Sequence, residues 1–170
     1  LELLDDCEHI FLFDDDMRPK AAGWWVPYIE SPLPHLMYVF VDYACGPQVR
    51  DTVEVHRDES YVAYSHPRGC MLYLHRSCLE RVGGMDWGYG VWGYEHADLS
   101  DRICEAGLTP YAYTDVVDSQ LLFHSEDEHR QTSSSVPGSV RSVCIPPNRA
   151  KYQASRGLAT YINYRERKVP

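Results

Sequence analysis

The sequence predicts an α/β fold, and three observations lead to that class. The apolar run Ile10-Phe11-Leu12-Phe13 is too short, and too rich in aromatic and β-branched residues, for a helix, so we expect a buried strand over residues 9–13. Apolar positions recur on one stripe between Glu95 and Ala106, which predicts an amphipathic helix. Short extended and helical segments alternate between these two, as in a sheet flanked by helices.

Three consecutive carboxylates, Asp14, Asp15 and Asp16, follow the first strand. In open α/β sheets the ligand lies beyond the carboxyl ends of the strands, which is where this triplet emerges. Like charges this close repel one another, so a divalent cation with diphosphate oxygens as further ligands would explain the arrangement. The alternative is an acidic turn without a ligand.

A second unusual segment, residues 83–99, alternates glycines with aromatic residues and then enters the predicted helix. Gly107 supplies the expected end of that helix. Glu95 then lies in its first turn, where the backbone dipole favours a carboxylate. Asp98 and Arg102 are four residues apart, which favours a surface ion pair over a catalytic role.

Four aromatic residues of this segment suit a sugar ring, which packs on flat apolar faces. They equally suit packing in the core, and the sequence leaves both interpretations open. The four residues are Trp87, Tyr89, Trp92 and Tyr94.

These segments resemble metal-dependent glycosyltransferases of the GT-A fold, a group that includes family-two enzymes and the β-1,4-galactosyltransferase and polypeptide N-acetylgalactosaminyltransferase families. Residues 11–19 (FLFDDDMRP) look like the DxD segment of that group. Residues 92–99 (WGYEHADL) look like its W-G-G-E-D segment. His124, 29 residues after Glu95, resembles the histidine that completes the metal site in the two named families. The resemblance implies a Rossmann-like mixed sheet flanked by helices.

The resemblance also implies a donor site and a metal site, with Mn²⁺ or Mg²⁺ as the cofactor. Carboxylate and imidazole ligands suit manganese well and magnesium acceptably. The expected donor-binding residues are Asp14, Asp15, Asp16, Arg68 and Gly69, and the expected metal ligands are Asp14, Asp16 and His124.

The expected catalytic residues are Glu95 and His96, and Glu95 is also the expected acceptor-binding group together with Trp87, Tyr89, Trp92 and Tyr94. The chain departs from the family pattern twice. His96 stands where inverting members commonly carry aspartate, and Tyr94 replaces a glycine. A histidine has an unperturbed pKa suited to a base, whereas a carboxylate would need burial. We favour Glu95 as the essential group.

The implied function is transfer of a sugar from a nucleotide sugar, expected to be UDP-linked, to a hydroxyl of a carbohydrate, protein or small molecule. One alternative is a non-catalytic sugar-binding or scaffold protein with a degenerate transferase fold. Another is a phosphohydrolase of the haloacid dehalogenase type with Asp14 as nucleophile. The last is disfavoured because Arg18 occupies the position expected for a small hydroxyl residue.

Composition agrees with one globular unit, since 170 residues with 44% hydrophobic content can bury one core. A net charge of −9 argues against a nucleic-acid binder. No apolar run approaches the ~20 residues of a membrane-spanning helix. The six cysteines show no CxxC spacing, so we expect reduced thiols and a cytoplasmic location.

We expect three parts: a partial catalytic core over residues 1–130, a mobile Ser/Pro-rich loop over 131–148 and a basic helix over 149–170. The last part carries six Lys/Arg against one Glu, which suits packing on the acidic body, contact with a partner or a second copy, or anionic lipid, in that order. Only about eight residues precede the DxD strand, so most of the N-terminal nucleotide-binding half of the GT-A fold is expected to be missing.

The remaining expected elements are short. They are helices at 1–7, 21–30 and 75–82, strands at 36–44, 110–114 and 120–124, and extended pieces at 51–56, 60–65 and 69–74.

Overall fold

A computed structural model describes residues 6–39, 52–126 and 136–165 of the chain. Its described strands form three small sheets, and every strand pair within them is antiparallel. The central sheet has the order β1-β6-β3, and the others are β2-β8 and β4-β5-β7. The bounds are β1 His9–Phe13, β2 Met17–Pro19, β3 His35–Met37, β4 Glu54–Arg57, β5 Val62–Tyr64, β6 Met71–His75, β7 Thr114–Asp115 and β8 Phe123–Ser125.

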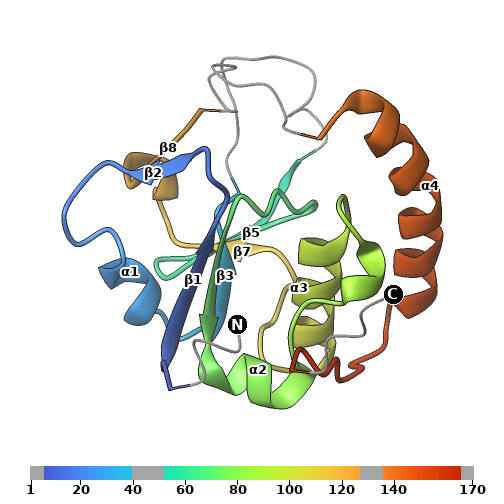
Figure 1. The fold of residues 1–170 in the computed structure, drawn as a ribbon. Coiled ribbons are helices and arrows are strands. Elements are labelled where there is room, and N and C mark those ends of the chain that lie inside the picture. Colours follow the sequence, from blue (N-terminus) through green and yellow to red (C-terminus); the bar gives the residue numbers. More distant parts are fainter. Residues whose placement is uncertain (1–5, 40–51, 127–135, 166–170) are drawn as a thin grey trace.

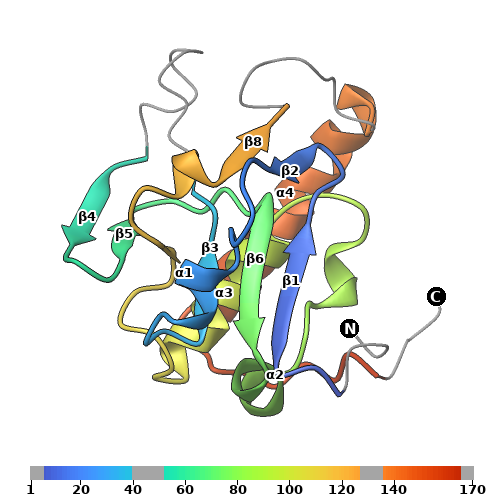
Figure 2. The same cartoon turned by 90° about the vertical axis from the view of Figure 1, so that its left-hand side faces the viewer.

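Helices cover both sides of the central sheet (Figure 1). Helix α3 lies between the sheet and the outermost helix α4, while α1 lies on the opposite side, as the rotated view in Figure 2 also shows. The bounds are α1 Val26–Ile29, α2 Arg76–Val82, α3 Glu95–Glu105 and α4 Gly138–Ser155, with short 3₁₀ turns at Trp87–Tyr89 and Ser119–Leu121. The predicted α/β class is confirmed, although the sheets of the described residues are antiparallel rather than mixed.

The central sheet is buried on both faces because successive side chains of a strand point to opposite sides. In β6, Leu72 and Leu74 belong to the core cluster shared with α2 and α3. Met71 and Tyr73 of the same strand belong to a second cluster that includes Tyr28 of α1. This double burial explains why the strand reads as a nearly continuous apolar run.

The strand over 9–13 and the helices near 75–82 and 95–106 are confirmed. Gly107 follows the last of these with a φ of 77°, which is the conformation expected of a glycine just past a helix end. The other strands are shorter than predicted. Residues 40–44 of the strand expected at 36–44, and residues 1–5 of the helix expected at 1–7, lie outside the described residues; residues 6 and 7 are not helical.

The helix predicted at 21–30 is wrong in length, since only Val26–Ile29 is α-helical. Pro27 explains the late start. A proline suits the first turn of a helix but clashes with the carbonyl four residues earlier, so the helix cannot extend toward Gly23. Trp24 and Trp25 therefore lie in the preceding turn.

The loop predicted at 131–148 and the helix predicted at 149–170 are both corrected by α4, which spans Gly138–Ser155. Pro146 and Pro147 lie inside it, and each removes a backbone donor. Residues 127–135 and 166–170 lie outside the described residues. After α4 the chain returns to the body, where the Ile162 N–H donates to the Val82 carbonyl at 3.0 Å.

The described cysteines (Cys7, Cys70, Cys78, Cys104 and Cys144) are free thiols. Burial raises the pKa of Cys78 to about 12 and also raises that of Cys70, so both stay protonated at neutral pH.

Candidate active site at the exit of β1

The acidic triplet occupies the turn between β1 and β2. The Asp14 N–H donates to the Cys70 carbonyl at 2.8 Å, which extends the pairing of β1 with β6 by one residue. The Met17 N–H then donates to the Asp14 carbonyl at 3.2 Å and closes the turn. Asp14 and Asp15 are exposed, and Asp16 is half-buried. The carboxylates thus emerge at the C-terminal end of the strand, as predicted.

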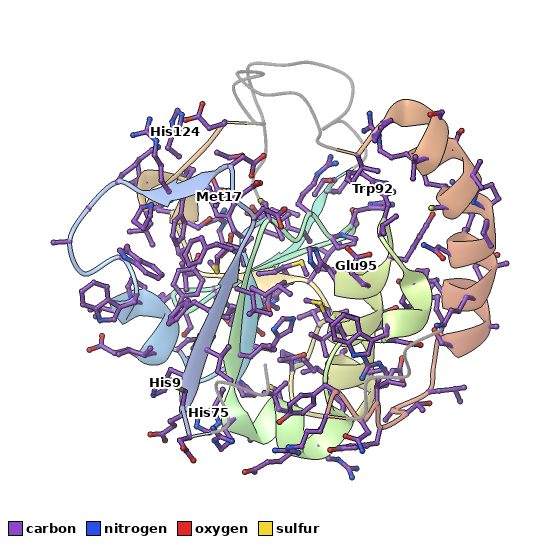
Figure 3. The ribbon with its side chains drawn as sticks, in the orientation of Figure 1. His9, Met17, His75, Trp92, Glu95 and His124 are labelled. Carbon is purple, nitrogen blue, oxygen red and sulfur yellow. The ribbon has the colours of Figure 1, made fainter. Side chains whose placement is uncertain are left out.

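The start of α3 is shaped by two residues with positive φ. Gly93 has a φ of 93° and Tyr94 has a φ of 78°, which is uncommon for a residue with a side chain. The Tyr94 carbonyl accepts the first helical hydrogen bond, from the Asp98 N–H at 2.8 Å. Glu95 therefore lies in the first turn, as predicted (Figure 3). Its Oε2 atom is buried and has no hydrogen-bond partner among the described residues.

The structure places Asp14 near Glu95 and His96, although the acidic triplet and the start of α3 are distant in the sequence. Loss of surrounding water at the crowded strand exit raises the pKa of Asp14, the His96 imidazole opposes that shift, and the carboxylates of Asp16, Glu95 and Asp15 add to it. The His96 Nε2 atom lies 3.9 Å from Glu95 Oε1. The end of β1 and the start of α3 therefore share one electrostatic environment.

Gly69 makes this approach possible. It precedes β6 with a φ of 80°, and a Cβ atom at this position would collide with the imidazole of His96. A glycine thus satisfies both the backbone conformation and the close packing. The half-buried Arg68 is its neighbour. Arg68 and Gly69 thus directly precede Cys70, whose carbonyl accepts from the Asp14 N–H.

His124 lies on β8, opposite Arg18 of β2 in the strand register. Its Nε2 atom is 3.6 Å from Glu126 Oε1, and the Glu126 N–H donates to the Asp16 carbonyl at 2.9 Å. Figure 3 shows His124 on one side of the strand ends and Glu95 on the other. Within residues 6–39, 52–126 and 136–165, no three His, Cys, Asp or Glu side chains form a group that could hold a metal ion.

The four aromatic residues of the segment differ in environment. Tyr89 is 2% exposed and its hydroxyl donates to Asp98 Oδ1 at 3.1 Å, so it packs in the interior. Trp87 is 61% exposed. Trp92 and Tyr94 are half-buried, and both contact α4: Arg141 lies over the Trp92 ring at 5.2 Å, and the Tyr94 ring lies 5.2 Å from that of Tyr152.

The ion pair predicted between Asp98 and Arg102 exists, with Arg102 Nε donating to Asp98 Oδ2 at 2.8 Å. Its predicted surface position is wrong, because the two residues are 4% and 2% exposed. The guanidinium also donates to the carbonyls of Val82 and Gly84, at 2.7 Å each. The pair therefore connects α3 to the residues at the end of α2 in the interior of the protein.

Sequence reasoning missed the contribution of α4 to this region. Asn148, Arg149 and Lys151 each contact the segment that leads into α3. The signal was weak because Asn148 follows two prolines in a stretch that reads as a loop, and polar residues in such a stretch are usually solvated.

Part of the chain matches a known protein family. Residues 53–125 match a family model described as the N-terminal domain of galactosyltransferase. That range includes Glu95, His96 and His124 and begins after the acidic triplet. Searches of curated proteins and of solved structures found no match. The matched range covers less than half of the chain; together with the α/β fold it indicates a similarity to a glycosyltransferase domain.

None of the helices in the described part of the chain has both the length and the apolar character needed to cross a membrane.

Proposed function

We propose that this chain is a glycosyltransferase domain that transfers a sugar from a UDP-linked donor to a hydroxyl acceptor with the help of a divalent cation. The observation that carries the proposal is the proximity of the exit of β1 to the start of α3: Gly69 packs against the His96 ring, and the next residue, Cys70, accepts a hydrogen bond from the Asp14 N–H. The match of residues 53–125 to a galactosyltransferase family model supports the same reaction class.

At the acceptor end, Glu95 is the group we assign to the acceptor hydroxyl. Its buried Oε2 atom has no partner among the described residues, and an acceptor O–H would supply the missing donor. The hydroxyl must lose its proton as it attacks the sugar carbon, and a base within hydrogen-bond reach contributes about 10²–10⁴-fold to such a step. His96, whose ring lies against Gly69, takes the secondary role of orienting Glu95.

At the donor end, Asp14 and Asp16 are the carboxylates proposed to hold Mn²⁺ or Mg²⁺, with His124 as a third ligand and Arg68 and Gly69 beside the diphosphate. A bound cation would neutralise the charge of the leaving diphosphate as a Lewis acid. The three proposed ligands do not form a ready group within the described residues, so the cation would have to draw them together.

Turnover by two variants tests the acceptor assignment. Glu95→Gln keeps the shape and removes the charge, so we expect a loss of roughly 10²-fold or more in turnover, with nucleoside-diphosphate binding unchanged. His96→Asn serves as the neighbouring comparison and should cost less. A larger loss for His96→Asn would reverse the two roles, and full activity in both variants would contradict the acceptor site.

Calorimetry tests the proposed metal site independently of transfer activity. UDP is titrated into the protein with and without Mn²⁺, and into Asp16→Ala and His124→Ala. We expect metal-dependent UDP binding in the parent and its loss in both variants, because each removes a ligand. Glu80→Ala, which removes an exposed carboxylate on α2, is the matched control. Unchanged affinity in both site variants would rule out this site.

A second candidate is a sugar-binding protein without turnover. It is favoured by the absence, among the described residues, of a ready three-ligand metal group and by His96 in the place of a family aspartate. Binding of a nucleotide sugar without transfer or hydrolysis by the whole chain, across a panel of hydroxyl acceptors, would select this candidate over the first.

A further inference from the structure

Asn148 of α4 reaches across to the segment that leads into α3, residues 85–94, which we call the aromatic loop. Its side-chain nitrogen Nδ2 donates to three backbone carbonyls of that loop: Tyr89 at 2.7 Å, Trp92 at 2.6 Å and Gly93 at 3.2 Å. Asn148 is 7% exposed, which makes it the one buried residue among the described residues of α4.

A side-chain amide suits a position that faces three backbone carbonyls. The NH₂ group carries two hydrogens and here faces three acceptors, so one hydrogen is shared between two carbonyls. The oxygen of the same amide would repel these carbonyls, which fixes the orientation of the side chain. A single side chain therefore joins three points of the loop.

The aromatic loop needs such support because Tyr94 at its end has a strained backbone conformation. Gly90 and Gly93 have positive φ, and so does Tyr94, for which this conformation costs of order 1–3 kcal/mol. The first turn of α3 has no side-chain cap of its own, since Tyr94 provides none. The direction in which Glu95 leaves the loop thus depends on contacts made from outside it.

Two neighbours of Asn148 hold the same loop at its ends. Arg149 Nε donates to the Tyr94 hydroxyl at 2.9 Å. Lys151 Nζ lies 2.6 Å from Asp86 Oδ2, and Asp86 in turn accepts from the Gly88 N–H at 2.8 Å. These two pairs are partly exposed, whereas Asn148 acts in the interior.

We propose that Asn148 is a positioning residue that fixes the aromatic loop and so sets the direction of Glu95 toward the acceptor. The proposal rests on the proposed function for its catalytic consequence. Its structural consequence, an aromatic loop held from α4, stands without any activity and is measured separately.

The experiment compares Asn148→Asp with Gln153→Glu. Both changes turn an amide into a carboxylate on α4, but Gln153 is exposed, whereas at position 148 the new oxygen faces three carbonyls. Backbone amide hydrogen exchange should become roughly tenfold faster or more in peptides covering residues 85–95 of Asn148→Asp. The buried carbonyls of the loop lose their donor in this variant, so the loop opens more often. Exchange in β1 and β6 should stay as in the parent, and Gln153→Glu should match the parent throughout.

Asn148→Ser, which keeps one donor, is measured in parallel and should lie between the parent and Asn148→Asp. Unchanged exchange in residues 85–95, or equal acceleration along the whole chain, would overturn the proposal. Failure of Asn148→Ser to fold would also overturn it, since the residue would then serve the whole fold rather than the loop.

Steady-state kinetics test the catalytic consequence of the proposal. In Asn148→Asp we expect kcat to fall and the acceptor KM to rise, each by about tenfold, with UDP affinity unchanged. An equal loss of donor affinity would contradict a role confined to the acceptor side. If the parent protein transfers no sugar at all, the proposed function fails, while the exchange comparison still decides whether Asn148 holds the loop.

Discussion

The central sheet and helix α4 are attached to the same helix, α3, by opposite kinds of contact. On the sheet side, α3 buries Leu99 and Ile103 among aliphatic side chains of β1, β6 and α2. On the α4 side, the contacts are polar: Tyr152 donates to Asp101 at 2.6 Å, and Ser155 donates to Asp98 at 3.0 Å.

The two sides of α3 therefore contribute differently: one to the stability of the fold and the other to the orientation of the helix. Apolar burial contributes roughly 25 cal/mol per Å² and tolerates small shifts. Hydrogen bonds contribute less to net stability but require defined distances and directions. The sheet side therefore holds α3 in the fold, and the α4 side fixes the orientation of its first turn and of the aromatic loop.

Arg102 gives the clearest test, because its guanidinium binds the carbonyls of Val82 and Gly84 while its partner Asp98 also accepts from Ser155 of α4. Arg102→Met removes the guanidinium and leaves Asp98 buried without its cation. We expect the free energy of unfolding to fall by about 3–5 kcal/mol, the usual result of breaking a buried pair. Urea unfolding of the parent and the variant measures this loss.

Arg81→Met is the matched control, since Arg81 is exposed on α2 and should tolerate the change within about 0.5 kcal/mol. A loss below about 1 kcal/mol for Arg102→Met would mean that the pair does not fasten α3, and that the apolar contacts alone hold this side together.

The sheet side could be predicted from the sequence because its signals are local. The apolar run before Asp14 and the stripe of Leu99 and Ile103 have the periods of a strand and a helix, and Gly107 marks a helix end. Pairing partners and sheet order were not predictable, since they depend on contacts between distant segments.

For the candidate site, the sequence placed Asp14 at a strand exit and Glu95 in a first helical turn, and the structure confirms both positions. The proximity of Asp14 to Glu95 and His96 was only implied by the resemblance to a known fold. Asn148 and the buried position of Arg102 were not predictable, because a polar residue gives the same local signal whether it is solvated or buried against a distant partner.

His35 tests the junction between β3 and α3 through pH. Burial lowers the pKa of its imidazole to about 4, and its Nε2 atom lies 2.8 Å from the Ser100 hydroxyl of α3. Since the unfolded chain binds a proton near pH 6.5 and the folded chain does not, the free energy of unfolding falls as pH drops from about 6.5 to about 4. Between pH 7 and pH 5 this contribution amounts to about 2 kcal/mol.

Urea unfolding of the parent and of His35→Gln at both pH values isolates the effect. Asp115, whose pKa burial raises to about 7, acts in the opposite direction over this range, but it does so equally in both proteins. The variant should therefore lose about 2 kcal/mol less than the parent on acidification. Identical pH dependence of the two proteins would show that His35 is not buried in its neutral form.

Lys151 is expected to give the smallest effect and tests the claim that the α4 side contributes little to stability. Its Nζ atom pairs with Asp86 and lies 4.5 Å from the centre of the Tyr89 ring, but the side chain is 37% exposed. Lys151→Gln should lower the free energy of unfolding by less than about 1 kcal/mol, and the loss should shrink in high salt as the pair is screened. Lys151→Arg, which keeps the charge, is the control. A loss above about 2 kcal/mol that persists in high salt would show that α4 stabilises the fold as strongly as a core element, and the division between the two sides of α3 would not hold.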